Sequence, residues 1–587
     1  MYALGIDIGG TFTDIVLRST DQRTFSHKEL TTTSDPAEAV LRGVRHLIDT
    51  HGIRPDQISR TVHATTLFTN ALIEREGAAT GLITTQGFRD TLEIGRERKY
   101  DLYDVKIQRP TPLVARAHRH EVAERIDDRG NTLLELDEDA VARAAAALAE
   151  VGVQSIAIVF LHAYANPAHE HRAADIVRRT VPDMHVTTSH EIAPEIREYE
   201  RTSTTVINAY IKPLAARYLD DILARFDELG IGGPFHLMLS NGGLGTVDEA
   251  KRAPVRLLES GPAAGALSAA HTGSGDGLLD IVAFDMGGTT AKLCLIEEGE
   301  PSVAFSFEAA RADRFSEGSG LPVLIPTVDL IEIGAGGGSI ARRDALGLMK
   351  VGPRSAGSLP GPAAYGLGGT GATVTDADFA LGFLDPENFA AGTVPIDMAA
   401  CHEALRAMGA ETKLSLEAVS FGVYDIVNEA MAGAARVHFA ERGVDPRRFT
   451  LIATGGAGPV HAFAVARKLG LRSLLCPASA GVASAMGLLV APARADRAKT
   501  VGIRTDIDPL DDLEIRRYAD GRFVGQGFSL TVGLPEAPID LAQPEAARAG
   551  LIAAFRDAYA EKFTHAPPDM PIEFIETWIN TWKANWV

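Results

Sequence analysis

A short motif that occurs twice constrains this chain more than any other feature. Asp7-Ile-Gly-Gly-Thr-Phe-Thr-Asp and Asp285-Met-Gly-Gly-Thr-Thr-Ala-Lys share one pattern, and apolar strands precede and follow each copy. P-loop and dinucleotide motifs instead have their glycines between a strand and a helix. We therefore predict two β-hairpins whose turns, rather than a helix N-terminus, hold an anion.

The residue types in both copies suit the binding of a polyphosphate. Paired glycines allow positive φ and bring the backbone close to an anion, and successive N–H groups form a concave anion site. Threonine hydroxyls add further donors. The residues that we expect to contact phosphate are Gly9, Gly10, Thr11, Phe12 and Thr13 in the first copy and Gly287, Gly288, Thr289 and Thr290 in the second.

The aspartate that opens each copy indicates a metal ion. Asp7 and Asp285 repel phosphate directly, but a hydrated Mg²⁺ (or Mn²⁺) bridges carboxylate and phosphate. Lys292, in the second copy, is the candidate for neutralising developing charge. An ordinary hairpin turn explains one copy equally well. Two copies with Asp and Thr in the same places favour a clamp that grips one polyphosphate across a cleft between two related domains.

Two further glycine-rich segments are candidate nucleotide elements. The first consists of Gly455, Gly456, Ala457 and Gly458, and it follows an apolar strand and precedes a helix. It either contacts adenosine or forms a tight strand-to-helix turn. The predicted phosphate clamp favours contact with adenosine. The other contains Gly336 and Gly337 and is too rich in glycine for a regular strand. Such a cluster indicates either a nearby ligand or close backbone packing.

A polar cluster ends the apolar segment before residue 67. His63, Thr65, Thr66 and Asn70 either line a cleft or cap the start of a helix, and the sequence does not choose between these alternatives. No general base stands out. His63 is a candidate, and His461 is another, although a lone histidine near the start of a helix is more often structural.

Length, charge and cysteine content restrict the class of protein. With 587 residues the chain exceeds one compact core, so we expect two or more domains. A net charge of -20 argues against nucleic acid or an anionic membrane as partner, because both need a basic face. The N-terminus lacks the pattern of a signal peptide, apolar runs are too short to span a bilayer, and the three cysteines are far apart. These features are typical of a cytoplasmic protein.

Strands alternate with amphipathic helices along most of the chain, which is typical of an α/β protein. We expect helices over 201–229 and 416–437, a helix that starts at Gly261, and a strand over 449–453. The segment 331–371 is dense in glycine and proline, so it is predicted as loop.

Several long motifs follow one another in a recognisable order. They are GIDIGGTFTD, HATTLFTNALIEREGA, ESGPAAGA, FDMGGTTAKLCLIEEGE, GSGLPVLIPTVDLIEIGAGGGSIAR, VGPRSAGSLPGPAAYGLGGTGATVTDADFALGFLDP and TGGAGPVHAFAVARKLG. As far as about Thr500, the sequence resembles the hydantoinase A / 5-oxoprolinase / acetone carboxylase β-subunit family. The Thr-Ala-Lys form of the second motif resembles its N-methylhydantoinase A and aromatic ketone carboxylase branch.

The resemblance implies a fold, a reaction and a partner. The fold is a pair of duplicated ribonuclease H-like domains of the actin, hexokinase and chaperone type, spanning 1–195 and 196–500, plus a C-terminal α+β region at 501–587. The chain is then the A-type subunit of a hetero-oligomer, which uses ATP and Mg²⁺ to phosphorylate the oxygen of a cyclic amide such as a hydantoin or lactam. A B-type subunit completes ring opening. Phosphorylation of an enolate by a ketone carboxylase subunit is the alternative.

Relative to that family, the stretch between Ile503 and Tyr518 is short, so we expect the sequence to omit a segment and region 501–587 to be incomplete. Two rival classes share the phosphate motifs. A small-molecule kinase would release a stable phosphorylated product without a partner subunit. A chaperone-like or filament-forming ATPase would turn over ATP without consuming a small molecule.

Overall fold

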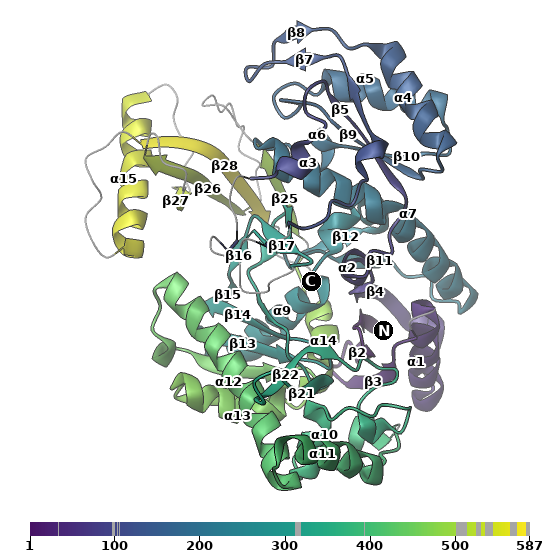
Figure 1. Ribbon diagram of the computed structural model, residues 1–587, viewed down its shortest axis with the longest axis vertical. Coiled ribbons are helices and arrows are strands. Elements are labelled where there is room, and N and C mark those ends of the chain that lie inside the picture. Colours follow the sequence, from purple (N-terminus) through teal and green to yellow (C-terminus); the bar gives the residue numbers. More distant parts are fainter. Residues whose placement is uncertain are drawn as a thin grey trace.

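The computed structural model describes residues 1–32, 35–96, 100–101, 104, 106–107, 109–311, 318–392, 394–492, 494–499, 514–523, 530–534, 544–563 and 572–582. Helices and several separate sheets form a mixed α/β arrangement. In Figure 1 the purple N-terminal strands lie near the middle, a smaller sheet lies at the top, and the green helices lie at the bottom.

A six-stranded sheet carries the first copy of the motif. In spatial order its strands are β12 (Leu244–Thr246), β11 (Phe235–Met238), β4 (Ile58–Thr65), β1 (Tyr2–Ile8), β2 (Phe12–Ser19) and β3 (Thr24–Leu30). β1 pairs antiparallel with β2 and parallel with β4, so the first glycine turn joins two central strands. Apolar side chains of helices α1 (Pro36–His51) and α7 (Glu198–Glu228) pack with Leu4, Ile6 and Ile15 of this sheet.

A second sheet repeats this local order around the second copy. β13 (Ile281–Met286) pairs antiparallel with β14 (Ala291–Glu297) and parallel with β23 (Thr450–Thr454). β15 (Glu300–Pro301), β20 (Ile331–Ile333) and β24 (Ser473–Leu475) complete the sheet. Both predicted hairpins are therefore present. A common apolar core joins the sheet to α10 (Val374–Ala380), α11 (Met398–Thr412), α12 (Leu416–Arg442) and α13 (Gly458–Leu469).

A smaller parallel sheet has four strands and lies at the top of Figure 1. Its strands are β10 (His185–Thr188), β9 (Ser155–Val159), β5 (Thr80–Thr85) and β6 (Arg119–Val122). Helices α4 (Glu138–Glu150) and α5 (Ala168–Thr180) pack on it through a separate apolar core. Short helices connect these parts of the chain, namely α2 (Leu67–Ile73), α3 (Thr91–Ile94), α6 (Ser189–Ile192) and α8 (Val247–Arg252).

Two helices made largely of small residues link the two hairpin sheets. α9 (Ser260–Gly275) contacts the second sheet through Ala263 and Ala266, and it contacts the first through Ala264. α14 (Ala483–Val490) crosses α9 at Gly487, where a Cβ would lie 1.8 Å from the carbonyl oxygen of Ala264. A Cβ on Gly5 of β1 would lie 2.4 Å from the carbonyl oxygen of Ala485 in α14. Because Gly5 and Gly487 have no side chains, both helices fit between the sheets.

The expected helices and strand are largely confirmed. α7 and α12 cover the predicted helices at 201–229 and 416–437, α9 begins next to Gly261, and β23 matches the strand at 449–453. The prediction of loop over 331–371 is wrong in part. This segment contains β20, and β21 (Ser339–Arg343) pairs with β22 (Met349–Ser355). Cross-strand pairing outweighs local preference there, as is usual for short strands.

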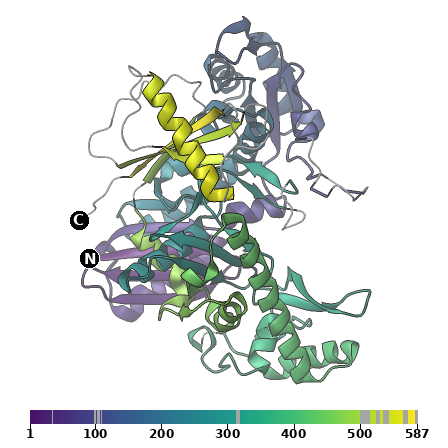
Figure 2. The same ribbon diagram turned by 90° about the vertical axis from the view of Figure 1, so that its left-hand side faces the viewer.

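The remaining strands form small pairs and a C-terminal sheet. The pairs are β16 (Val303–Ala304) with β19 (Thr327–Val328), β17 (Phe307–Ala309) with β18 (Leu321–Val323), and β7 (Arg125–Ile126) with β8 (Thr132–Leu134). The C-terminal sheet consists of β25 (Arg494–Lys499), β28 (Ile572–Trp582), β26 (Glu514–Phe523) and β27 (Leu530–Leu534). Helix α15 (Pro544–Phe563) lies in front of these strands in Figure 2.

The predicted domain boundaries stay predictions. The first sheet takes β11 and β12 from beyond residue 196, so its strands do not come from 1–195 alone. Most of 503–518, where we expect an omitted segment, lies outside the described residues. Within the described part of the chain, we find no helix with both the length and the apolar character needed to cross a membrane.

The tight crossing of α9 and α14 predicts that Gly487→Ala lowers the melting temperature. The added methyl group has no room beside the Ala264 carbonyl, and overpacking of this kind costs about 1–3 kcal/mol. Gly433→Ala in α12 is the matched control, because a Cβ there meets no atom within 4 Å. Alanine in a helix is favoured over glycine by about 0.5–1 kcal/mol. Differential scanning fluorimetry compares the two, and equal melting temperatures would contradict the packing described.

Candidate active site

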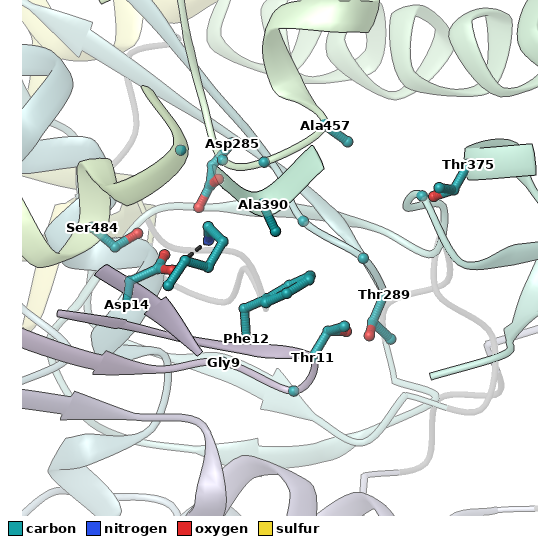
Figure 3. Close-up of a pocket in the computed structure, with 18 of the residues that line it drawn as sticks. Gly9, Thr11, Phe12, Asp14, Asp285, Thr289, Thr375, Ala390, Ala457 and Ser484 are labelled. Atoms are coloured by element: carbon teal, nitrogen blue, oxygen red, sulfur yellow. Dashed lines mark hydrogen bonds and ion pairs between the residues drawn. The ribbon is translucent and has the colours of Figure 1, made fainter. Parts of the chain in front are cut away.

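A cavity of about 450 Å³ lies between the two hairpin turns. This volume falls within the range of about 300–1,000 Å³ that is usual for small-molecule sites. Both turns contribute to its wall, as do Gly261, Gly337 and Gly455 from three other segments. Figure 3 shows Thr11 of the first hairpin next to Thr289 of the second. The structure thus brings the two copies of the motif to one shared cavity.

Among the turn glycines, Gly288 is needed for the close approach of the two turns rather than for an unusual backbone angle. A Cβ on Gly288 would lie 2.7 Å from the Thr11 hydroxyl oxygen, and a Cβ on Gly10 would lie 3.7 Å from that of Thr289. None of the turn glycines at 9–10 and 287–288 has φ in the left-handed range, so the expectation of positive φ is wrong. Side chains at these positions would push the turns apart or fill the cavity.

The glycine cluster around residue 336 supports the second turn from behind. The N–H of Gly337 donates to the carbonyl oxygen of Gly287 at 3.0 Å. A Cβ on Gly336 would lie 2.6 Å from the carbonyl carbon of Thr289. Gly337 lines the cavity, whereas Gly336 does not. Proximity to a ligand site therefore explains Gly337, and close backbone packing explains Gly336.

The candidate adenosine segment also reaches the cavity. Gly455, Gly456 and Ala457 line it, whereas Gly458 is the first residue of α13. Gly455 has a φ of 81°, and a Cβ there would lie 2.3 Å from Oδ1 of Asp285. Only glycine fits at this position, because both the backbone angle and the nearby carboxylate exclude a side chain.

Three carboxylates line the cavity at the hairpins, those of Asp7, Asp14 and Asp285. Burial, followed by the charges of Asp14 and Asp285, raises the pKa of Asp7 to about 7 against the opposing effects of Lys28 and Ser484. Burial also raises the pKa of Asp14 and of Asp285. Oδ1 of Asp7 is buried and lacks a hydrogen-bond partner. An unpaired buried carboxylate beside two others is suited to a cation, which removes both the repulsion and the cost of burial.

The donor set fits a hydrated Mg²⁺ or Mn²⁺. Mg²⁺ usually keeps several waters and is held by one or two carboxylates together with substrate phosphates. Asp7 and Asp285 would be those carboxylates, since both line the cavity. Within the described ranges, no three or more His, Cys, Asp or Glu side chains are grouped so that they could hold a metal ion.

One lysine lies in the cavity wall near each hairpin, but only the second hairpin carries its own lysine. Across the hairpins, Asp7 pairs in register with Asp14, whereas Asp285 pairs with Lys292. The lysine of the first half is Lys28, which lies on β3 and forms an ion pair with Asp14. Lys28 is not among the residues predicted from the sequence, although opposite charges on paired strands are a usable signal.

Lys292 is held by a carboxylate at the start of α9. Its Nζ lies 2.6 Å from Oε2 of Glu259, a non-glycine residue with a φ of 59° that immediately precedes the helix. Burial alone lowers the pKa of Lys292, but the charges of Glu259, Glu332 and Asp285 outweigh it and raise the pKa. Lys292 is therefore a cation at every physiological pH.

Another part of the cavity wall is largely apolar and was not predicted. It lies next to α10 and α13, and its described members are Tyr365, Phe383, Leu384, Phe389 and Val460. These residues are spread along nearly 100 positions of the sequence. No local pattern connects them, because only the packing of α10 against α12 and α13 brings them together.

Two of the predicted site residues lie behind the cavity. Thr13 is buried, and its hydroxyl bonds to that of Thr31 at 3.1 Å. His63 is fully buried on β4, where its ring nitrogens lie 3.2 Å from the Ile6 carbonyl oxygen and 2.8 Å from the Tyr218 hydroxyl. Burial lowers the pKa of His63 to about 4. It does not line the cavity, so we do not retain it as a general base.

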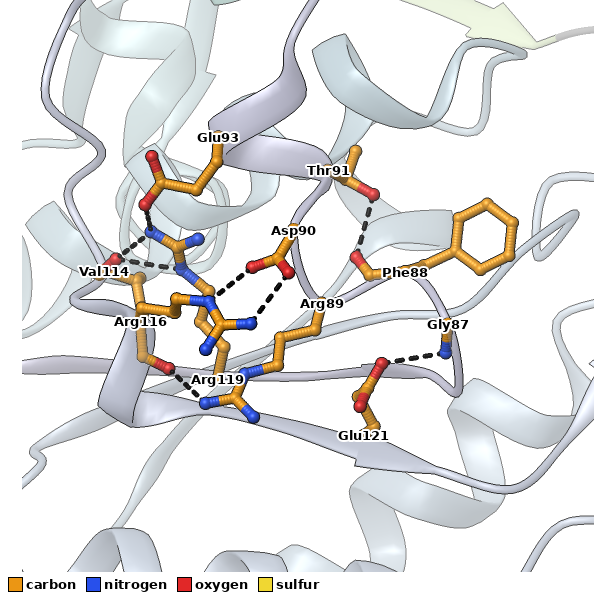
Figure 4. Close-up of polar contacts among 10 residues, drawn as sticks. All are labelled: Gly87, Phe88, Arg89, Asp90, Thr91, Glu93, Val114, Arg116, Arg119 and Glu121. Atoms are coloured by element: carbon orange, nitrogen blue, oxygen red, sulfur yellow. Dashed lines mark hydrogen bonds and ion pairs between the residues drawn. The ribbon is translucent and has the colours of Figure 1, made fainter.

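A separate polar cluster lies beside β5 and β6 (Figure 4). Arg116 donates two hydrogen bonds to Asp90, at 2.8 and 2.9 Å, and the buried Arg119 donates to Glu93 at 3.0 Å and to the Val114 carbonyl. None of these residues lines the cavity. The cluster ties residues 87–93 to residues 114–121, and its exposed carboxylates are suited to control substitutions.

Comparison with protein families gives two adjacent matches. The model of the hydantoinase/oxoprolinase N-terminal region matches residues 3–181, and that of hydantoinase/oxoprolinase matches residues 201–497. The chain belongs to the hydantoinase/oxoprolinase family. It is 34% identical to caprolactamase subunit alpha of Pseudomonas jessenii, over 98% of this chain and 86% of that protein. It is 36% identical to the acetophenone carboxylase gamma subunit of Aromatoleum aromaticum, over 78% of this chain and 64% of that protein.

Solved structures of this family have the same fold. The structure of ATP-dependent caprolactamase from Pseudomonas jessenii has a TM-score of 0.83 at 32% identity and covers 99% of this chain and 87% of that one. The nucleotide-free structure of acetone carboxylase has a TM-score of 0.77 at 26% identity and covers 99% of this chain and 88% of that one. The predicted α/β class and the family resemblance are thereby confirmed.

The raised pKa of Asp7 predicts that Asp7→Asn changes stability in a pH-dependent way. The folded protein keeps this proton up to about pH 7, whereas the unfolded chain releases it near the ordinary value of 3.8. Stability is therefore lost as pH rises through this window. Without metal or nucleotide, we expect Asp7→Asn to have a higher melting temperature than the wild type at pH 8. The corresponding gain in unfolding free energy is at most about 4 kcal/mol, and it is smaller at pH 5.

Asp90→Asn is the control, because Asp90 is outside the cavity and is ionised at both pH values, its pKa being lowered by Arg116. Its effect on melting should be the same at pH 5 and pH 8. A difference between wild type and Asp7→Asn that does not change with pH would show that Asp7 titrates normally.

Proposed function

We propose that this chain is the A-type subunit of an ATP-dependent hydantoinase or lactamase, which phosphorylates the oxygen of a cyclic amide to activate ring opening. The observation that carries this proposal is the meeting of two Asp-x-Gly-Gly-Thr hairpins at one cavity. The family of the chain and its likeness to an ATP-dependent caprolactamase support it.

We infer that each half of the chain is a ribonuclease H-like domain of the type found in actin, hexokinase and heat-shock chaperones. Both hairpin sheets have the same local order, with the strand that carries the aspartate between its antiparallel partner and a parallel strand. In this proposal 1–195 and 196–500 are the related halves and 501–587 is the C-terminal region.

In the proposed complex the turns bind the phosphates of ATP. Backbone N–H groups of the turns donate to phosphate oxygens, and Thr11, Thr289 and Thr290 add hydroxyl donors. Asp7 and Asp285 hold Mg²⁺ or Mn²⁺, which when bound supplies positive charge at the phosphates. Lys28 and Lys292 add two fixed cations in the same cavity wall. This arrangement serves phosphoryl transfer, which depends mainly on positioning and charge neutralisation.

Phosphorylation suits a cyclic amide because its carbonyl carbon is a poor electrophile. Attack of the amide oxygen on the γ-phosphorus forms an O–P bond, and the bond between the γ-phosphorus and the bridging oxygen breaks to release ADP. Water then adds to the ring carbon, the ring C–N bond breaks as the nitrogen takes a proton, and hydrolysis of the resulting acyl phosphate releases the phosphorylated oxygen as phosphate. We propose that a B-type subunit completes this second step in a cytoplasmic hetero-oligomer. The relatives are named as alpha, beta and gamma subunits, which supports such an assembly.

A ketone carboxylase subunit is the second candidate, because the chain is also similar to acetophenone and acetone carboxylase subunits. The two candidates share the ATP site and differ in the step after phosphorylation. In the carboxylase an enolate oxygen receives the phosphoryl group, and turnover depends on bicarbonate. A small-molecule kinase is more remote, since it needs no partner subunit.

The proposal predicts metal-dependent ATP hydrolysis that requires a small molecule. We expect the purified chain, with its co-purifying partner, to release ADP when Mg²⁺ and one of a panel of hydantoins and lactams are present. Asp285→Asn should reduce the rate by about 100-fold or more, as for the loss of one preorganised charge in an active site. Asp90→Asn, outside the cavity, should retain wild-type turnover. ADP release that needs a ketone and bicarbonate would select the carboxylase, and release unaffected by Asp285→Asn would refute the site.

A further inference from the structure

The side chain of Phe12 has no part in the binding of phosphate. It takes the position that Thr290 has in the second copy of the motif, and an aromatic ring offers phosphate no hydrogen-bond donor. The ring lines the cavity and is partly exposed, and it is not among the described residues of the apolar core on this sheet. In Figure 3 it points away from its strand and into the cavity. Phe12 therefore presents an apolar surface to a ligand that binds beside the phosphates.

The alternation of side chains along β2 places a charged pair beside this ring. Phe12 and Asp14 lie on the face of the strand that meets the cavity, whereas Thr13 between them is buried on the other face. Nζ of Lys28, on the neighbouring strand β3, lies 5.0 Å from the centre of the Phe12 ring and forms an ion pair with Asp14. An ammonium group has three N–H donors. Lys28 is therefore able to donate to a ligand next to the ring as well as to Asp14.

An uncharged hydrogen-bond acceptor lies on the other side of β1. Thr66 directly follows β4, which pairs with β1 along the edge opposite to β2, and its side chain lines the same cavity. The Thr66 hydroxyl donates to the Ile8 carbonyl oxygen at 3.2 Å. Because its hydrogen is used in this way, the lone pairs of Oγ1 are suited to accept a hydrogen bond from a ligand. The first half of the cavity wall therefore combines an apolar ring, a cationic donor and a neutral acceptor.

The charges of the cavity wall disfavour a substrate with a negative charge of its own. The described lining residues include five aspartates but only two lysines, Lys28 and Lys292, and each lysine already pairs with a carboxylate. His461 is fully buried and paired with Asp378, so it is not available to a ligand. The triphosphate of the proposed nucleotide adds further negative charge. A substrate carboxylate would therefore be buried without a cation to pair with, which is costly.

We propose that the ring of the substrate lies on Phe12, and that this subsite takes an uncharged cyclic amide rather than one that carries a carboxylate. The inference rests on the proposed function. It places the substrate beside the first hairpin, whereas the adenosine segment at 455–457 belongs to the second half of the chain. The flat amide packs against the aromatic face. Its carbonyl oxygen accepts from Lys28, and its ring N–H donates to Thr66.

Matched pairs of substrates test the preference for an uncharged ring. The pairs are 2-pyrrolidinone with 5-oxoproline and 5-methylhydantoin with hydantoin-5-acetic acid, and the members of each pair differ by one carboxylate. ADP release is measured with the full chain, its co-purifying partner, ATP and Mg²⁺. We expect kcat/KM to be at least about 10-fold higher for the uncharged member, since the other buries an unpaired charge. Equal values, or a preference for the charged member, overturn the inference alone. If no member of either pair supports ADP release, the proposed cyclic amide activity falls with it.

Phe12→Leu tests the residue itself. Leucine stays apolar but removes the flat ring, so we expect KM for the uncharged amide to rise about 3- to 10-fold while KM for ATP stays within about 2-fold of wild type. Phe463→Leu is the matched control and should leave both values unchanged, because Phe463 also has a cation over its ring, Arg467 at 5.9 Å, but lies exposed on α13 outside the cavity. A higher KM for ATP with an unchanged KM for the amide would show that the ring contacts the nucleotide instead. The substrate pairs need no variant, so they decide the matter even if Phe12→Leu does not fold.

Discussion

The site depends on how closely helix α9 approaches two aspartates that repel each other. A Cβ on Gly261 would lie 3.0 Å from Oδ1 of Asp7, and a Cβ on Gly265, one helical turn later, would lie 3.3 Å from Oδ2 of Asp285. The glycine face of one helix thus contacts both carboxylates, while α14 holds that helix in place at Gly487. The glycines of α9 lower its helix propensity, and the packing of α9 between two sheets offsets that cost.

The two halves have matching backbones but opposite arrangements of charge. In the first half an acid stands opposite the aspartate and a neighbouring strand supplies Lys28; in the second half Lys292 stands opposite the aspartate and Glu259 supplies the acid. Each half therefore contributes one lysine and two carboxylates near the cavity. This balance keeps the lysines fixed and charged, while Oδ1 of Asp7 lies buried against α9 without a hydrogen-bond partner. The two halves repeat one backbone arrangement, but the lysine and the second carboxylate come from different positions in each half.

Local signals in the sequence predicted the backbone of the site well. The glycine turns at 9–10 and 287–288 stand between apolar strands, and such a pattern leaves few alternatives to a hairpin. Residues that converge only through tertiary packing were not predictable; Phe383 and Val460 meet at the cavity because α10 packs near α13. The prediction of His63 as a site residue failed because a polar residue on a strand can also find its hydrogen-bond partner in the core. The partner of His63 there is the Tyr218 hydroxyl.

The central claim is that both hairpin turns bind the same polyphosphate, and it is tested most directly by a crystal structure of the chain with Mn²⁺ and a non-hydrolysable ATP analogue. The account predicts one triphosphate in contact with backbone N–H groups of both turns, at 9–12 and at 287–290. It also predicts an anomalous manganese peak between Asp7 and Asp285. A nucleotide bound to one turn only, or at a site away from both aspartates, would contradict it.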